Sequence, residues 1–176
     1  MATRMAQPDE TDGEIGKPLD AAAFREAMSR IGTAVHVAAT DGPAGRVAAT
    51  VSAFASVTDS PPTILVCINR KTRLNAGIRA NGVFTVNTLP AHAQAISDAF
   101  AGRNPMTMDE RFATTDWRVG ETGAPIMVEA RVALDCQVGE ILESGSHSVI
   151  FASVVGAYIG DQESALIYLD RSYHRL

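Results

Sequence analysis

The densest group of residues able to do chemistry is a run of hydroxyl side chains between positions 50 and 60. Thr50, Ser52, Ser56, Thr58 and Ser60 are interspersed with small apolar residues. Hydroxyls, and backbone N–H groups that small neighbours leave accessible, can bind an anionic phosphate where no lysine is present. A β-strand whose polar face carries serine and threonine would give the same pattern. The run therefore predicts either a phosphate-binding segment or an ordinary strand.

The histidines and cysteines form no recognisable metal or nucleophile motif. Cys67 and Cys136 lie far apart and neither belongs to a CxxC pair, which argues against a zinc ribbon, a redox dithiol or a disulfide scaffold. No HExxH, Walker, GxGxxG or GxSxG sequence occurs. We therefore expect no metal site, and we interpret His36 and His92 as structural. The histidines are scattered, with no two at ligand spacing: His36, His92, His147 and His174.

Length and charge exclude several broad classes of function. The 176 residues suffice for one ordinary domain, and a composition of 46% hydrophobic and 20% charged residues is typical of a soluble globular chain. A net charge of −5, without a basic stripe, argues against a nucleic-acid partner. No apolar run approaches the roughly 20 residues that cross a bilayer, and the N-terminus has no hydrophobic signal core. We expect a protein of the reducing cytoplasm with no membrane partner.

Residues 1–18 differ in composition from the rest of the chain. Their only large apolar side chains are Met1, Met5 and Ile15. Such a segment cannot bury enough apolar surface to offset the entropy lost on ordering it. We expect a mobile tail at 1–18, or an arm that wraps a partner subunit, followed by one folded domain at 19–176.

The first half of this domain combines strands with short helices. Asp20 is a suitable N-cap for a helix that Gly32 ends, and residues 41–45 have the turn composition of a hairpin. Because prolines lack an N–H group, Pro61 and Pro62 delay the start of the next strand. We predict strands at 34–40, 46–52, 63–69 and 83–88. We predict further helices at 72–80, ended by Gly82, and at 92–101, with an apolar face of Ala95, Ile96, Ala99 and Phe100.

The second half is more plainly β. Even positions in residues 131–138 are apolar, which is the pattern of a half-buried strand with Asp135 on its polar face. Residues 143–146 have turn composition, and further strands are predicted at 147–159 and 166–169. Seven strands with few helices predict a mainly β fold, an antiparallel barrel that is closed or partly closed.

Seven sequence blocks, in one order, resemble the short-chain flavin reductases, which are the reductase components of two-component flavin monooxygenases. The first block is the hydroxyl-rich segment TVSAFASVTDSPP at 50–62. The resemblance covers roughly residues 24–176. Within the family, the sequence is most similar to the reductases of pyrimidine degradation and to those that serve hydroxyphenylacetate hydroxylases. The other blocks are LVCINR at 65–70, VN at 86–87, FAG at 100–102, GAP at 123–125, GSH at 145–147 and RSYH at 171–174.

This resemblance implies a split β-barrel of the FMN-binding type, normally a homodimer, with FMN or FAD in a groove near the subunit interface. It implies NADH or NADPH as the hydride donor without a Rossmann fold, so the missing GxGxxG sequence is no objection. Reduced flavin would then pass to a separate monooxygenase.

Carried over by position, the resemblance also implies roles for individual residues. The segment 50–56 would hold the flavin phosphate and ribityl chain, and residues 67–70 would line the ring and tail. His147 would be the catalytic residue on the nicotinamide side, where Tyr173 and His174 would also lie. Val51 stands where the family usually has alanine, so its side chain must point away from the phosphate. Arg103 could meet a nucleotide phosphate or merely a helix end. The implied cofactor-binding residues are Ala49, Thr50, Val51, Ser52, Ala53, Ser56, Cys67, Ile68, Asn69, Arg70, Thr72, Phe100, Ala101, Gly102, Tyr173 and His174.

Two other functions remain open at this point. One is a reductase of a corrinoid cobalt centre that keeps its flavin bound, and the other is a flavin-binding barrel without turnover. A corrinoid reductase would keep its flavin bound, whereas a supplier of reduced flavin would release it. The presence of His147 and of the Tyr173-His174 pair argues against the second.

Overall fold

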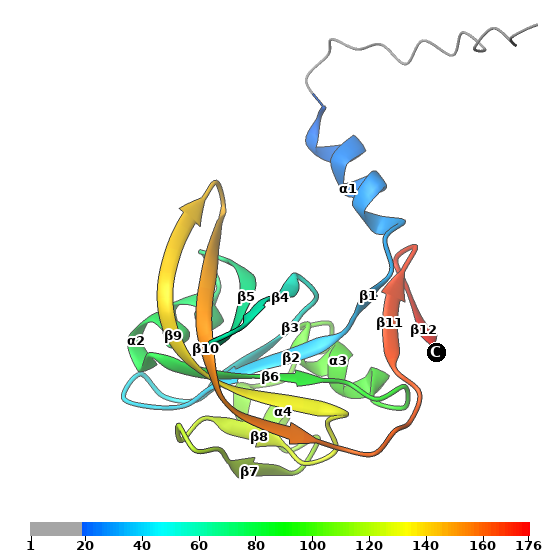
Figure 1. Cartoon of the computed structure of the whole chain (residues 1–176). Helices are drawn as coiled ribbons and strands as arrows, with labels where there is room; N and C mark the ends of the chain where they lie inside the picture. Colours follow the sequence, from blue (N-terminus) through cyan, green and yellow to red (C-terminus); the bar gives the residue numbers. More distant parts are fainter. Residues whose placement is uncertain (1–18) are drawn as a thin grey trace, which may run out of the picture.

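The computed structural model describes residues 19–176, so the predicted mobile tail at 1–18 lies outside the described residues. Within them the chain forms a seven-stranded, a three-stranded and a two-stranded sheet, together with short helices. The fold is therefore mainly β with a few helices, as the sequence predicts (Figure 1). The helices are α1 (Ala21–Ser29), α2 (Arg73–Asn81), α3 (Gln94–Phe100) and α4 (Met108–Phe112). The strands outside the large sheet are β1 (Thr33–Ala34), β7 (Trp117–Val119), β8 (Pro125–Met127), β11 (Leu166–Leu169) and β12 (Ser172–Arg175).

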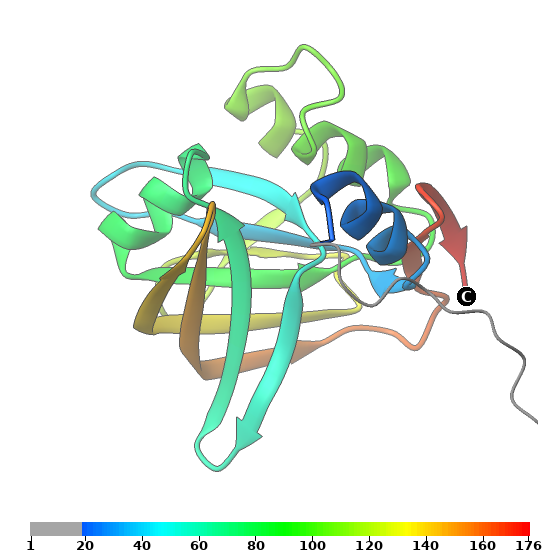
Figure 2. The same ribbon diagram turned by 90° about the horizontal axis from the view of Figure 1, so that it is seen from above.

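The large sheet is antiparallel throughout, and its strand order is β3-β2-β6-β9-β10-β5-β4. Its two edge strands, β3 and β4, are consecutive in the chain. The sheet curls so that these edges meet at Ser52 and Ala53, beyond which the two strands diverge without pairing (Figure 2). This open seam matches the predicted split barrel. The strands are β2 (His36–Thr40), β3 (Val47–Val51), β4 (Phe54–Asp59), β5 (Pro62–Asn69), β6 (Val83–Thr88), β9 (Val132–Ser144) and β10 (His147–Ile159).

Six of the seven predicted strands lie in this large sheet, and the predicted strand at 166–169 is β11 of the three-stranded sheet. The hydroxyl-rich segment 50–60 contains the end of β3, the Ser52-Ala53 link and β4. The ordinary strand that the sequence predicted as one alternative corresponds to β4. The Ser52-Ala53 link, which is not part of a strand, is the part left for the other alternative, a phosphate-binding segment. From Ala55 onward β4 is exposed on both faces, as befits an edge strand rich in polar residues.

Hydrophobic cores lie on both faces of the large sheet. The inner core, inside the curl, contains Phe84 and Ile150 and is closed at one side by α2. The outer core lies between β2, α3, α4 and β8 and contains Phe100 and Ile126. The strand β2 is buried along its whole length because it contributes side chains to both cores. Burial on both faces explains why its sequence lacks polar alternation.

Helix α2 begins and ends where the sequence predicts. The Thr72 side chain accepts a hydrogen bond from the backbone N–H of Asn75, and Gly82 ends the helix with a φ of +73°. Gly77 lets the helix lie close against β3, because a Cβ there would stand 2.5 Å from a Val47 methyl carbon. The N-terminus of α2 is thereby fixed beside β3.

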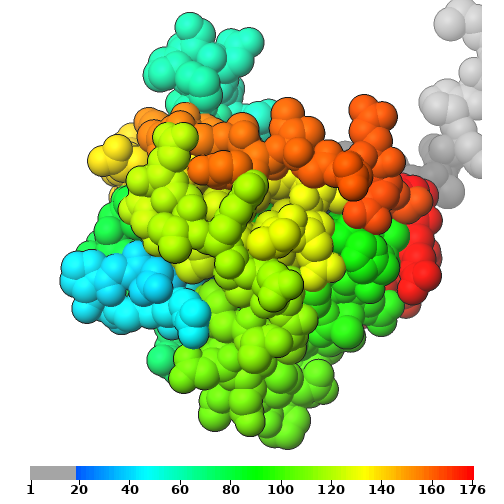
Figure 3. Space-filling view, turned by 90° about the horizontal axis from the view of Figure 1, so that it is seen from below, coloured from blue at the N-terminus to red at the C-terminus, as the bar shows by residue number. Residues whose placement is uncertain are grey.

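The prediction that Asp135 lies on an exposed polar face is wrong. Its side chain is fully buried, because the segment that carries β7 and β8 covers this face of β9 (Figure 3). The carboxylate accepts hydrogen bonds from the backbone N–H of Thr122, at 3.0 Å, and from the Thr122 hydroxyl, at 2.5 Å. Alternation shows only that the two faces of a strand differ, and a polar face can be buried when a loop satisfies its hydrogen bonds.

The predicted helix at 92–101 is α3, which is shorter at its start. Ile96, Ala99 and Phe100 are buried as expected, whereas Ala95 is exposed. The helix packs its buried side against β3 and β2 and so brings residues 97–103 to the end of β3.

Helix α1 stands away from the sheet (Figure 1). Its N-cap is Asp20, as predicted, but none of its residues is buried, and the apolar side chain of Phe24 is 54% exposed. An ion pair between Arg171 and Glu26, at 2.6 Å, holds the helix to the turn between β11 and β12. The apolar side chains of α1 are therefore exposed in the described chain.

Candidate functional site

Three pockets adjoin one another along β3 and its link to β4. The middle pocket has a volume of about 270 Å³ and lies between this link, the end of β5 and the start of β10. None of the side chains that line it is a lysine, an arginine or a carboxylate. The middle pocket is lined by Ala49, Thr50, Val51, Ser52, Ala53, Cys67, Ile68, Asn69, Thr72, Leu74 and His147.

The tyrosine pocket lies on the other side of the strand end and has a volume of about 280 Å³. It shares Thr50, Val51 and Ser52 with the middle pocket, so the two are separated only by this stretch of chain. It carries one cation and two aromatic rings. Its remaining lining residues are Val35, Ala101, Arg103, Tyr168 and Tyr173.

The arginine pocket adjoins the opposite side of the middle pocket and has a volume of about 360 Å³. It shares Ala49, Thr72 and Leu74 with the middle pocket. Two guanidinium groups and the N-terminal end of α2 face it. Its remaining lining residues are Val47, Ala48, Arg73, Met106, Thr107, Met108 and Arg111.

Most of the residues that the family resemblance implies line the middle or the tyrosine pocket. The structure separates two that were assigned to the same side, because His147 lines the middle pocket and Tyr173 the tyrosine pocket. The implied residues that line none of the three pockets are Ser56, Arg70, Phe100, Gly102 and His174.

Those remaining residues have other surroundings. Phe100 is buried in the outer core against the rings of Phe112 and Trp117, with centroids 5.5 and 5.9 Å away. Ser56 lies on the exposed edge strand β4, and the His174 ring contacts the Leu169 carbonyl at 3.2 Å. Gly102 ends α3 with a φ of +73° and lies against the guanidinium of Arg111.

Backbone hydrogen bonds hold the walls of the middle pocket. The Cys67 N–H donates to the Ala53 carbonyl at 2.9 Å, which ties the link between β3 and β4 to β5. The pairing of β10 with β5 sets His147 opposite Asn69. The Ser146 hydroxyl lies 2.9 Å from Nδ1 of the His147 ring. The imidazole is thus held at the rim of the pocket by main-chain geometry and one side-chain contact.

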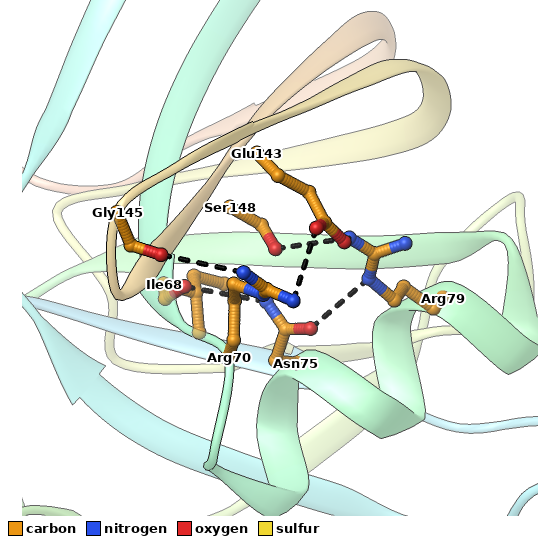
Figure 4. A network of polar contacts seen from close by, with 7 residues as sticks. All are labelled: Ile68, Arg70, Asn75, Arg79, Glu143, Gly145 and Ser148. Carbon is orange, nitrogen blue, oxygen red and sulfur yellow. Dashed lines mark hydrogen bonds and ion pairs between the residues drawn. The ribbon is translucent and has the colours of Figure 1, made fainter.

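A charged network braces the β9–β10 hairpin that carries His147 (Figure 4). Glu143 pairs with Arg70 at 3.0 Å and with Arg79 at 2.9 Å, so one carboxylate joins the end of β5 to α2. Arg79 also donates to the Asn75 side chain and to the Ser148 hydroxyl. Arg70, which the resemblance assigns to flavin binding, therefore also braces the hairpin.

Two threonines of the site use their hydroxyls in the fold. Thr50 donates to the Ser97 carbonyl at 2.7 Å, which ties β3 to α3. Thr72 donates to the Asn69 carbonyl at 2.8 Å and caps α2. The Ser52 hydroxyl has no hydrogen-bond partner among residues 19–176 and lines two pockets. The Val51 side chain packs against the inner core, and the residue also lines the middle and tyrosine pockets.

Beneath the link between β3 and β4 lies a buried histidine. His36 pairs with Val51 in the sheet, contacts the Phe54 ring with centroids 4.8 Å apart, and has its Nδ1 2.9 Å from the Thr88 hydroxyl. Burial lowers the pKa of His36 to about 4, because desolvation disfavours the imidazolium form. The ring is therefore neutral at physiological pH, and it adds no charge under the middle pocket.

The arginine pocket has the charge pattern of an anion site. The N-terminus of α2 carries a partial positive charge, and Arg73 and Arg111 add two full charges. Sequence reasoning missed Arg111 and the whole of α4. A signal was present, since Thr107 and Glu110 form a capping box, the threonine-x-x-glutamate pattern that starts helices.

Among residues 19–176, no helix combines the length and the apolar composition needed to cross a bilayer.

Comparison with known proteins identifies the family. Residues 28–176 match the family described as the flavin reductase like domain. The chain belongs to this family. A relative from Ancylobacter novellus, named FMN reductase (NADH) RutF, is 46% identical over 173 residues, which cover 97% of this chain and 94% of the relative.

Solved structures of flavin reductases share the fold as well. BorF, the flavin reductase component of a bacterial two-component tryptophan halogenase, has a TM-score of 0.82 at 28% identity, covering 89% of this chain and 98% of its own. The Streptomyces globisporus NADH:FAD oxidoreductase SgcE6, solved with NAD and FAD fragments, has a TM-score of 0.82 at 25% identity, covering 91% and 94%.

Proposed function

We propose that this chain is an NADH-dependent flavin reductase that reduces FMN and supplies reduced flavin to a separate monooxygenase. Family membership and the names of its relatives support the reaction class and the two reactants. The observation that carries the proposal is the pocket arrangement, in which an uncharged pocket lies between two pockets that carry arginines. A flavin ring and a nicotinamide ring need an uncharged place to stack, and both molecules have an anionic tail.

The middle pocket suits the flavin ring. Its small side chains, Ala49 and Ala53, leave room for a flat ring, and backbone groups of the link and the Asn69 amide offer hydrogen bonds to the ring edge. Donors near the reduced ring stabilise the negative charge that it gains. The phosphate of FMN would lie in the arginine pocket, against Arg73, Arg111 and the N-terminus of α2.

In the proposed reaction the bound flavin supplies the N5 atom that accepts hydride from nicotinamide C4. The protein contributes orientation, exclusion of water and electrostatics. Residues of the link and of β5 hold the flavin ring in place. His147, at the rim, orients the nicotinamide or carries a proton. The network around Glu143 keeps the hairpin, and with it His147, over the pocket.

The test is anaerobic mixing of the protein with FMN and NADH while the visible absorbance of oxidised flavin is followed. We expect the absorbance to disappear at a rate proportional to protein concentration. No disappearance would reject the reductase function and leave a flavin-binding barrel without turnover. A flavin that stays bound through gel filtration after reduction would favour a corrinoid reductase over a supplier of free reduced flavin.

We further propose that the protein is a homodimer. The outer side of β4, β5, β10 and β9 carries cross-strand rows of apolar side chains that are half-buried or exposed in the described chain. One row joins Ala55, Leu65 and Phe151, and the other joins Cys67, Val149 and Leu142, the last 48% exposed. An apolar face of this kind marks an association surface, and a second copy would bury it symmetrically.

Sedimentation at micromolar concentration tests the assembly. We expect a species of twice the 18.6 kDa chain mass, converted toward monomer by Leu65→Glu. A wild-type protein that sediments as a monomer with flavin bound would reject the dimer.

A further inference from the structure

We propose that the tyrosine pocket binds the adenosine diphosphate half of NADH, with Arg103 on the pyrophosphate and Tyr168 and Tyr173 against the adenine ring. The inference rests on the proposed function and adds a second substrate site to it. The sequence alone left Arg103 undecided between a nucleotide phosphate and a helix end.

The chemistry of the lining carries this proposal. An adenosine diphosphate group needs a cation for its phosphates and aromatic surface for its base. The tyrosine pocket offers both within about 280 Å³. The Arg103 guanidinium lies 5.3 Å from the centroid of the Tyr173 ring, and the Tyr168 and Tyr173 centroids are 5.2 Å apart. Arg103, which would bind the phosphates, thus lies beside the two tyrosines that would pack against the adenine.

The position of the pocket fits a molecule that also reaches the flavin ring. Thr50, Val51 and Ser52 line both the tyrosine pocket and the middle pocket. A dinucleotide can therefore place its nicotinamide in the middle pocket and its other half beyond Ser52. The FMN phosphate is accounted for on the opposite side, where the α2 N-terminus and two arginines lie. The two anionic tails would then point in opposite directions from the stacked rings.

The residues of the tyrosine pocket are held in place before any ligand binds. The Tyr173 hydroxyl lies 2.8 Å from the Ser97 hydroxyl, and Ser97 in turn accepts from Thr50 through its carbonyl. Burial raises the pKa of Tyr173, so its hydroxyl stays neutral beside an approaching phosphate. Asp98 pairs with Arg103 at 3.1 Å and orients the guanidinium, although it also offsets part of its charge. A pyrophosphate, with more charge than one carboxylate, can still bind the exposed half of this group.

Two donors that differ only in the adenosine half provide the test. NADH carries it, whereas reduced nicotinamide mononucleotide ends at the first phosphate. In the full-length protein with saturating FMN, we expect Arg103→Ala to raise the KM for NADH about tenfold and to leave the KM for the mononucleotide within about twofold, since the mononucleotide lacks the adenosine-side phosphate of the pyrophosphate, which Arg103 would contact. Tyr168→Leu should act in the same direction. Arg118→Ala is the matched control, because Arg118 also lies over a tyrosine ring, that of Tyr158 at 4.3 Å, but outside all three pockets.

Other outcomes would overturn the inference. If Arg103→Ala raised the KM equally for both donors, Arg103 would act in hydride transfer or in stabilising the fold, and not in binding the adenosine diphosphate half. An unchanged KM for NADH, together with weaker binding of FAD but not of FMN, would assign the pocket to the adenosine of FAD. If wild-type protein transferred hydride from neither donor, the proposed function itself would fail, which is a distinct result from failure of the tyrosine pocket alone.

Discussion

The middle pocket and the two pockets beside it differ first in charge. The middle pocket is lined by small, hydroxyl and amide side chains with one histidine, whereas each neighbour carries at least one arginine. Uncharged surface suits the reacting rings, and the arginines suit the phosphates that those rings carry. If the proposed assignment of the pockets holds, this contrast is how a chain without a Rossmann fold or a Walker loop binds two nucleotides.

The pockets differ also in how their walls are fixed. Strand ends joined by backbone hydrogen bonds form the middle pocket. The other two pockets also use β3 or its link, but they add side chains from short elements, such as Arg111 on the five-residue helix α4 and Tyr173 on β12. Blocking the middle pocket should therefore prevent flavin from binding, and substitutions in the neighbours should change how tightly each tail is held.

Filling the middle pocket should have the largest effect. Ala53 is exposed on the link and lines this pocket, so Ala53→Trp would occupy the space of the flavin ring without disturbing the core. We expect FMN affinity to fall at least about 100-fold, which corresponds to almost 3 kcal/mol. Fluorescence titration of FMN measures it. The control is Ala157→Trp, on the exposed part of β10. Equal FMN affinities for the two variants would show that the flavin ring does not bind in the middle pocket.

Acid should destabilise the region beneath the link. The unfolded chain protonates His36 near its ordinary pKa of 6.5, whereas the folded chain resists protonation until about pH 4. Stability from this group is therefore complete above about pH 7 and is lost as the pH falls from 6.5 toward 4. We expect a loss of about 2 kcal/mol between pH 7 and pH 4.5. Urea unfolding of wild type and His36→Asn at both values measures it, and an equal pH dependence in the two proteins would show that His36 is not the cause.

Loss of His147 should slow turnover more than it weakens binding. We expect His147→Ala to lower the rate of flavin reduction about 30-fold at saturating FMN, somewhat less than the roughly 100-fold or more that a general acid or base typically contributes. FMN affinity should change little, because the residue lies at the rim. His92→Ala is the control, since His92 contacts Glu129 and Glu163 away from all three pockets. Wild-type single-turnover rates in His147→Ala would show that His147 takes no part in the reaction.

The smallest effect should come from a single hydroxyl. Ser52 lines two pockets, and Ser52→Ala should weaken FMN binding about fivefold, as expected for one hydrogen bond worth about 1 kcal/mol. Ser56→Ala, a few residues along on the exposed edge strand, should bind FMN like wild type. The reverse order of the two effects would mean that the phosphate lies along β4 and not in the arginine pocket.

Local signals in the sequence predicted much of the fold. Asp20 and Gly82 act at helix ends within a few residues of themselves, so their roles could be predicted without the structure. Asp135 was misplaced because its environment depends on a distant segment at 120–122. The Thr107 and Glu110 pattern could have revealed α4, but nothing local tied that helix to β3.

The candidate site was predictable only in part, for the same reason. The residues implied by the family blocks 50–62 and 65–70 mostly gather in the middle pocket, because they are neighbours both in the chain and in the sheet. The tyrosine pocket depends on β1 pairing with β11, which brings Val35 and Tyr168 together from opposite ends of the chain. A single sequence carries no signal for a contact between segments so far apart in the chain.

The position of bound flavin tests the central claim most directly. A crystal structure of the protein soaked with FMN should show the ring between Ser52, Cys67 and His147, and the phosphate beside Arg73 and Arg111. A ring between Tyr168 and Tyr173, with the middle pocket empty, would contradict the account.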